Sequence, residues 1–201
     1  MKDKILNIHD DILQDEFHYR LDKDIEKGKW MFDCTGGTKK TYPDDAKRDY
    51  RFWGLTMWRR ERYDMNFVNV DHIPTTEALM GFLKYYNQKY VPEINLVPNM
   101  LHCNGQTVGQ NGKGHRDVYN DDFKNYTLML MINTKWEKEW GGQFEILDKE
   151  KGNPKVVKTI DYKPGRVIFF DGSIPHRGIG PTIPDILRKT IVFKCIDPNR
   201  K

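Results

Sequence analysis

Three side chains in the second half of the chain are of the types that bind a metal ion. His115 and Asp117 are separated by one residue, and in an extended segment residues two apart project to the same side. His176 comes later, at the exit of an apolar run, with Pro175 before it and Gly178 close behind. Together, two imidazoles and one carboxylate would hold one side of a metal ion and leave the opposite side open.

An open site of this kind favours catalysis over a structural role for the metal. Structural zinc sites close their coordination with four protein ligands, usually including cysteine. The three cysteines are far apart and form no Cys-x-x-Cys pair. A facial set of two histidines and one carboxylate is the one that non-haem Fe(II) oxygenases use. The alternative is a surface His-x-Asp near a turn, since this tripeptide often arises by chance, but the order of His115, Asp117 and His176 favours the metal site.

Arg188 and Thr190 are candidates for an anion site near the metal. They lie two residues apart at the start of an apolar run, so in a strand they share one face while Lys189 takes the other. The charged side chain of an arginine at this position must reach solvent or pair with an anionic group. A guanidinium can bind a carboxylate, and the Thr190 hydroxyl could add a hydrogen bond to the same carboxylate. We expect a dicarboxylate to chelate the metal at one end and to meet Arg188 at the other. An edge-strand arginine that faces water is the alternative.

The residues after about position 96 are typical of short antiparallel strands. Apolar runs follow one another with turn residues between them, and no helical pattern of useful length intervenes. Strands are expected at 126–133, 142–147, 156–162, 166–170 and 189–196. Hairpins or Greek-key returns would connect them, because βαβ crossovers need helices. The pattern predicts a mainly β chain with flanking α-helices, in which a double-sheet or jelly-roll core carries the helices on one sheet.

Two helices are expected in the first part of the chain. The first has apolar residues at every fourth position, which are Leu13, Phe17, Leu21 and Ile25. Asp10 or Asp11 is expected to cap it and Gly28 to end it. The second is expected at about 75–90, with Thr75 as its N-cap.

Composition limits the class of protein. The chain has 201 residues and a net charge of +4, which is too weakly basic to indicate a nucleic-acid binder. No apolar run approaches the ~20 residues of a membrane span, and the N-terminus carries no signal-peptide pattern. We therefore expect a single cytoplasmic domain over 1–201. Within it, 1–95 would form a helical and irregular support and substrate region, and 96–201 the catalytic jelly roll.

In these features the chain resembles the 2-oxoglutarate- and Fe(II)-dependent dioxygenase superfamily, and within it the prolyl 4-hydroxylase-like branch. The resemblance covers roughly residues 96–196, and it rests on the order of its elements. They are His115-x-Asp117, the run 126–133 followed by Trp136, Trp140-Gly141-Gly142-Gln143-Phe144, the run 163–170 leading to His176, and Arg188-x-Thr190.

The resemblance implies a double-stranded β-helix core of the cupin type. His115, Asp117 and His176 would bind Fe(II), beside a site for O2. 2-Oxoglutarate would chelate the iron through its 1-carboxylate and 2-keto group, and its distal carboxylate would pair with Arg188 and Thr190. Oxidative decarboxylation to succinate and CO2 would be coupled to hydroxylation of a C–H bond in a peptidyl (such as prolyl) or small-molecule substrate. The resemblance also allows ascorbate as a cofactor.

The sequence departs from the pattern of collagen-type prolyl hydroxylases at one position and from that of another branch at a second position. Prolyl hydroxylases of collagen-like chains use a lysine for the distal carboxylate, whereas this chain offers Arg188, which argues against a collagen-type substrate. The nucleic-acid demethylase branch carries a second arginine six residues after the first, where this chain has Lys194. That branch is therefore disfavoured. His102 or Asn104 is a candidate for a further cosubstrate contact.

The substrate and the partners stay open. The segment 51–63 is rich in tryptophan, tyrosine and arginine. Either its aromatic residues pack on the core, or the segment forms a lid or groove for a peptide or an anionic small molecule, or it binds single-stranded nucleic acid by stacking and charge. The second functional hypothesis is a cupin-type binding protein that is non-catalytic or holds a different metal. A nucleic-acid-binding barrel gives no reason for the three ligand residues to converge. Either a monomer or a homodimer is compatible with the sequence.

Overall fold

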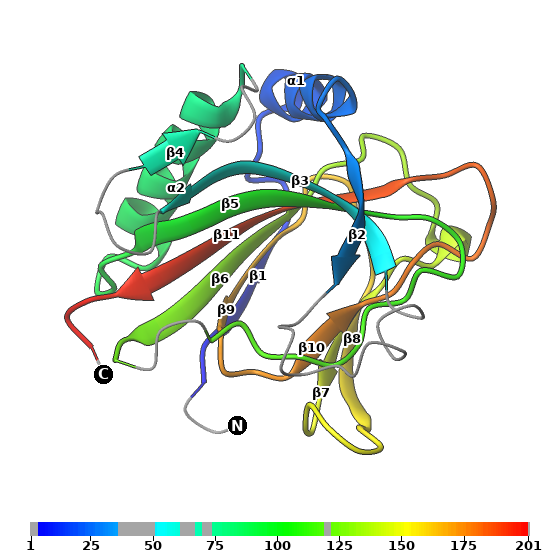
Figure 1. Ribbon diagram of the computed structural model, residues 1–201. Coiled ribbons are helices and arrows are strands. Elements are labelled where there is room, and N and C mark those ends of the chain that lie inside the picture. Colours follow the sequence, from blue (N-terminus) through cyan, green and yellow to red (C-terminus); the bar gives the residue numbers. More distant parts are fainter. Residues whose placement is uncertain (1–3, 36–50, 61–66, 70–73, 119–121, 201) are drawn as a thin grey trace.

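A computed structural model describes residues 4–35, 51–60, 67–69, 74–118 and 122–200 (Figure 1). These residues form an eight-stranded sheet, a three-stranded sheet and two α-helices, and every strand pairing is antiparallel. The prediction of a mainly β fold with flanking helices is confirmed. None of the helices in the described ranges is long and apolar enough to cross a membrane.

The larger sheet is built from strands that lie far apart in the chain. Its order is β1 (Leu6–His9), β9 (Val167–Asp171), β6 (Lys124–Met131), β11 (Arg188–Asp197), β5 (Val97–Gln106), β3 (Arg51–Arg60) and β2 (Met31–Thr35), with β4 (Phe67–Asn69) paired to β3. The smaller sheet has the order β10 (His176–Gly178), β7 (Phe144–Leu147) and β8 (Val156–Ile160). A short 3-10 helix, Lys138–Trp140, precedes β7.

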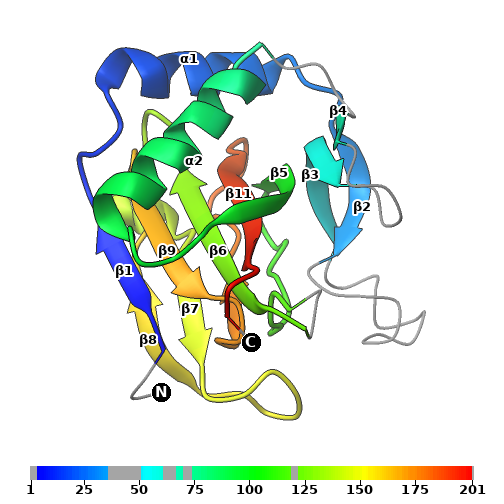
Figure 2. The same cartoon turned by 90° about the vertical axis from the view of Figure 1, so that its left-hand side faces the viewer.

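Strand β11 separates two apolar cores because successive side chains point to opposite faces. Ile191 and Phe193 belong to the core that also contains residues of helices α1 (Asp15–Glu26) and α2 (Thr76–Tyr90). Both helices cover the same face of the larger sheet (Figures 1 and 2). Val192 belongs to the second core, with residues of β7, β8 and β9. The opposite face of the larger sheet, lined by Val192, is therefore the inner face of a two-sheet core.

The two helices lie where the apolar spacing predicted them. Leu21 and Ile25 of α1 are fully buried. The predicted N-cap of α1 is wrong, because the helix begins after Gln14. Asp10 instead binds Arg166, and Asp11 has a positive φ of 60°. Thr75 holds the N-cap position of α2, although its side chain makes no capping hydrogen bond.

The prediction that residues 1–95 are helical and irregular is wrong where it omits strands. β1, β2, β3 and β4 all extend the larger sheet. A register shift between Thr56 and Trp58 in the pairing of β3 with β5 breaks the alternation of side chains, which hides the strand in the sequence. Trp58 is buried, as expected if the aromatic residues of 51–63 pack on the core, whereas Trp53 is only half-buried, against Phe32. Residues 61–63 lie outside the described ranges.

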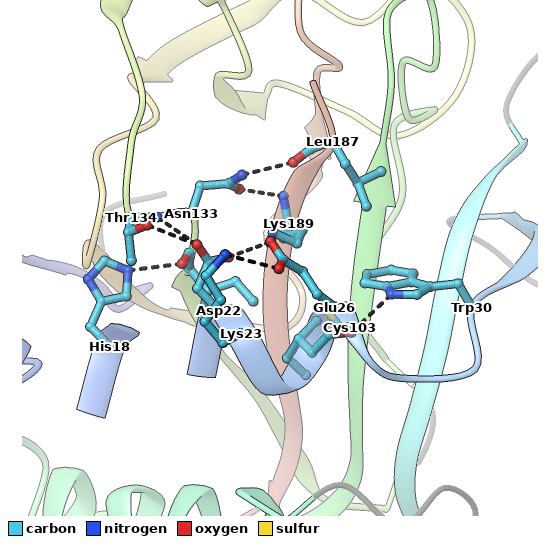
Figure 3. A network of polar contacts seen from close by, with 12 residues as sticks. His18, Asp22, Lys23, Glu26, Trp30, Cys103, Asn133, Thr134, Leu187 and Lys189 are labelled. Carbon is cyan, nitrogen blue, oxygen red and sulfur yellow. Dashed lines mark hydrogen bonds and ion pairs between the residues drawn. The ribbon is translucent and has the colours of Figure 1, made fainter. Parts of the chain in front are cut away.

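A buried polar network fixes β11 to α1 on the helix-covered face of the sheet (Figure 3). The Lys189 ammonium pairs with the Asp22 carboxylate and lies 3.0 Å from Glu26 Oε1. Asn133 accepts a hydrogen bond from the backbone N–H of Lys189 at 2.7 Å and donates one to the Leu187 carbonyl at 2.8 Å. The backbone on both sides of Arg188 is thus held in place.

Candidate metal centre

His115, Asp117 and His176 are brought together by backbone hydrogen bonds. The His115 N–H donates to the His176 carbonyl at 3.0 Å, and the His176 N–H donates back at 2.9 Å. The Asp117 N–H donates to the Gly172 carbonyl at 2.8 Å. His115 forms an isolated β-bridge with His176, and Asp117 lies outside any strand. The expected convergence of the three side chains is nevertheless found.

The three side chains present one ligand atom each, and these atoms lie within 4.8 Å of one another. His115 Nε2 is 3.6 Å from Asp117 Oδ1, and His176 Nε2 is 3.5 Å from Asp117 Oδ2. Neighbouring ligands that each lie about 2.0–2.2 Å from one metal ion are separated by about 3 Å. Small side-chain movements would therefore bring all three atoms into coordination distance.

Both imidazoles are oriented by a backbone carbonyl. Nδ1 of His115 lies 2.9 Å from the Lys113 carbonyl, and Nδ1 of His176 lies 2.8 Å from the Ile174 carbonyl. A carbonyl can only accept a hydrogen bond, so each Nδ1 carries a proton and each Nε2 is the nitrogen that faces the centre. Such outer hydrogen bonds are usual for histidines that bind a metal.

The protonation states of the ligands also suit a cation. Burial lowers the pKa of His115 to about 4, so its imidazole is neutral near pH 7. Burial opposes ionisation of Asp117, but the Lys194 ammonium and His176 hold the pKa of the Asp117 carboxyl well below its usual range. An anionic Asp117 and a neutral His115 result, and these are the states in which a carboxylate and an imidazole bind a transition metal.

Arg188 is fully buried at the start of β11 and keeps one donor free for a ligand. Its Nε donates to the Gly142 carbonyl at 2.7 Å, and its Nη1 donates to Gln106 Oε1 at 2.8 Å. Nη2 is buried and has no hydrogen-bond partner within the described ranges. Burial lowers the pKa of Arg188 to about 10, so the guanidinium is still charged near pH 7. A buried cation with an unused donor fits an anionic ligand.

Sequence reasoning missed two of the side chains that hold Arg188. The Tyr162 ring lies against the guanidinium, 5.2 Å from ring centre to Cζ, and its hydroxyl donates to the Lys189 carbonyl at 2.6 Å. Gln106 supplies the acceptor for Nη1. No local motif marks either residue, because strand pairing brings Gln106 to Arg188 and packing brings Tyr162 there, both from distant parts of the chain.

Gly142 allows tight backbone geometry beside Arg188. Its φ is +79°, and an added Cβ would lie 2.5 Å from the Trp136 ring. Its carbonyl is the acceptor for Arg188 Nε. The glycine therefore lets the backbone pass between Trp136 and Arg188.

The other expected site residues lie on the inner face of the larger sheet. Thr190 is buried and pairs with Met131 on β6 and with Asn104 on β5. His102 pairs with Val192, two residues further along β11. Thr127 on β6 donates from its hydroxyl to Asp117 Oδ2 at 2.8 Å.

Sequence comparison agrees with this arrangement. The family model for the 2OG-Fe(II) oxygenase superfamily matches residues 100–193, a span that contains the three converging ligands, Arg188 and Thr190. No curated protein sequence matches the chain.

Solved structures share the fold at low sequence identity. A prolyl hydroxylase from Trichoplax adhaerens, in complex with a hypoxia inducible factor peptide fragment, matches with a TM-score of 0.65 and 13% identity, over 96% of this chain and 84% of that one. A 2OG-Fe(II) oxygenase family oxidoreductase from Burkholderia pseudomallei matches with a TM-score of 0.66 and 13% identity, over 98% of this chain and 88% of that one. The viral collagen prolyl hydroxylase of Paramecium Bursaria Chlorella virus-1, as a 2OG complex, matches with a TM-score of 0.57 and 16% identity, over 96% of this chain and 97% of that one.

Proposed function

We propose that this chain, a member of the 2OG-Fe(II) oxygenase superfamily and a dioxygenase that uses Fe(II), 2-oxoglutarate and O2, hydroxylates a C–H bond of a peptidyl substrate. Proline is the first residue to test, because the neighbours from Trichoplax adhaerens and from the virus are prolyl hydroxylases. The test must distinguish a peptidyl substrate from a small-molecule substrate. The observation that carries the assignment is the convergence of His115, Asp117 and His176 in the same fold as a buried Arg188.

His115, Asp117 and His176 are the residues that would hold the iron. Their Nε2 and carboxylate atoms face one another, while their Nδ1 atoms and both oxygens of Asp117 also make hydrogen bonds within the protein. The bound iron would supply the activation of O2. Phe144 and Phe170 pack against the His176 ring and restrict the access of water to that ligand.

Arg188 and Thr190 would bind the distal carboxylate of 2-oxoglutarate. The free Nη2 of Arg188 is a charge-assisted donor, and the buried hydroxyl of Thr190 lies on the same face of β11. The hydrogen bonds to Gly142 and Gln106 hold the guanidinium before the ligand arrives, which lowers the entropic cost of binding.

The proposed reaction balances without a further reductant. One molecule of O2 supplies one oxygen atom to the new hydroxyl group and one to succinate. 2-Oxoglutarate loses its 1-carboxylate as CO2 and provides two electrons, and the substrate C–H bond provides the other two. The products are succinate, CO2 and the hydroxylated substrate.

The test combines binding with turnover. Fe(II) and 2-oxoglutarate, added without air, should give a weak visible charge-transfer band that His176→Ala abolishes. In air, succinate release is then measured against a panel of prolyl peptides, other peptides and small molecules, and the product mass should rise by one oxygen atom. If no divalent metal binds at micromolar concentrations, the assignment fails. If only small molecules stimulate succinate release, the peptidyl part fails.

A further inference from the structure

Lys194 lies against a proposed metal ligand, on the inner face of the larger sheet. It pairs with Met100 on β5 and with Thr127 on β6. Its ammonium is mostly buried and lies 2.5 Å from Asp117 Oδ1. Thr127 binds the other oxygen of the same carboxylate. The protein thus supplies its own cation to Asp117 at the point where the metal is expected.

This contact changes the charge of the proposed metal centre. Asp117 contributes one negative charge, and Lys194 contributes one positive charge beside it. The pair is therefore close to neutral before a metal enters. A divalent ion must share Asp117 with the ammonium, and repulsion between two buried cations weakens binding of the metal alone.

A second cation lies on the same face of the same strand. Positions 188, 190, 192 and 194 of β11 all face inward, so Arg188 is at one end of this row and Lys194 at the other. His102, which faces them from β5, adds no charge, because burial lowers its pKa to about 3. A dicarboxylate that lies along the row would have a cation at each end.

We propose that Lys194 couples metal binding to cosubstrate binding. When both ligands are present, the ammonium leaves Asp117 to the metal and pairs with the metal-chelating carboxylate of the 2-oxo acid. The new anion offsets the repulsion that the metal meets alone, so the metal and the 2-oxo acid bind together more tightly than separately. This inference rests on the metal role proposed for His115, Asp117 and His176.

The coupling is measured with Mn²⁺, a redox-inert probe whose free fraction is read by electron paramagnetic resonance. In the wild-type chain, saturating 2-oxoglutarate should raise the affinity for Mn²⁺ by about tenfold or more, within the usual range of coupling between two sites. Lys194→Met should bind Mn²⁺ alone several-fold more tightly and lose most of this coupling. Lys194→Arg should keep it, because the positive charge stays.

A matched control separates the local contact from total charge. Lys84→Met removes the same charge from an exposed position on α2, across the larger sheet, and should behave as the wild type. Pyruvate, which has the 2-oxo acid group without the distal carboxylate, should also show coupling that Lys194→Met removes. If Lys194→Met does not fold, Lys194→Gln is used in its place.

The inference and the proposed function fail in different ways. If Lys194→Met binds Mn²⁺ no more tightly than the wild type and keeps the full coupling, Lys194 is only a counter-ion of Asp117, and the inference is wrong. If the wild type and Lys194→Met both fail to bind Mn²⁺, or if His176→Ala binds it normally, the metal centre itself is wrong.

Discussion

Gln106 Oε1 lies 2.8 Å from Arg188 Nη1, across the pairing of β5 with β11. The amide nitrogen of Gln106 donates to the carbonyls of Gln110, at 2.6 Å, and Gly178, at 3.2 Å. These bonds fix the amide, and the amide in turn fixes the guanidinium. The position of Arg188 therefore depends on a loop and on the smaller sheet as well as on its own strand.

Replacing Arg188 should weaken the binding of 2-oxoglutarate without changing metal binding. We expect Arg188→Met to raise the Kd for 2-oxoglutarate by about a hundredfold, the effect of losing a buried charge-assisted contact. Arg188→Lys should be intermediate, because an ammonium lacks the planar fork. Gln106→Leu should raise the Kd for 2-oxoglutarate by about tenfold, because the guanidinium loses the amide that positions it. Calorimetry with the Mn²⁺-loaded chain measures these values, and an unchanged Kd in Arg188→Met would refute the anion site.

Gly172 offers a test of how Asp117 is positioned. An added Cβ would lie 2.5 Å from the Asp117 carbonyl oxygen, so Gly172→Ala must displace that backbone. We expect the affinity for Mn²⁺ to fall by about tenfold or more. Gly81→Ala is the control, because nothing lies within 4 Å of its added Cβ and helix α2 should gain up to about 1 kcal/mol. Equal metal affinity in the two variants would contradict this account.

The ion pair between Asp22 and Lys189 should have a large effect on stability when only one partner is removed. Asp22→Leu leaves the buried Lys189 ammonium with Glu26 as its remaining carboxylate partner, and we expect a loss of about 1–3 kcal/mol in the free energy of unfolding. The double variant Asp22→Leu with Lys189→Met should recover most of that loss. Urea unfolding of the single and double variants measures the coupling. Additive losses would show that the pair does not act as a unit.

Asp10 should contribute stability that depends on pH. A hydrogen bond from Arg166 lowers the pKa of the Asp10 carboxyl to about 2. Because this folded-state pKa lies below the ordinary value, the stabilisation is present above about pH 4 and is lost as the pH falls towards 2. Asp10→Asn should therefore cost about 1 kcal/mol at pH 6 and much less at pH 2.5. Urea unfolding of both chains at the two pH values checks this, and an equal loss at both would exclude the ionic contribution.

The sequence predicted the convergence of His115, Asp117 and His176 better than it predicted the path of the chain. Their types and order were enough, because such residues have few other uses inside a β core. β5 was missed because its inner face carries His102 and Asn104 where a strand in a purely structural core would carry apolar residues. Polar residues on that face weaken the strand pattern.

The contacts between distant side chains could not be predicted in the same way. Lys194 was noted only for its position six residues after Arg188, and nothing in the sequence shows that its ammonium meets Asp117. That contact depends on the register of β11 against β6 and on the turn that carries Asp117. Gln106 and Tyr162 reach Arg188 through similar long-range pairings. Such contacts follow from the fold and have no local signal.

The pairing of β1 with β9 has a consequence for how the protein is made. Leu6 pairs with Phe170, so one of the first strands to be synthesised has no partner until most of the chain has been translated. His115 likewise has no bridge partner until His176 has been translated. Such distant pairings slow folding and expose unpaired strands on the way. His115, Asp117 and His176 therefore come together late in folding. We expect iron to bind only after the two sheets have packed together.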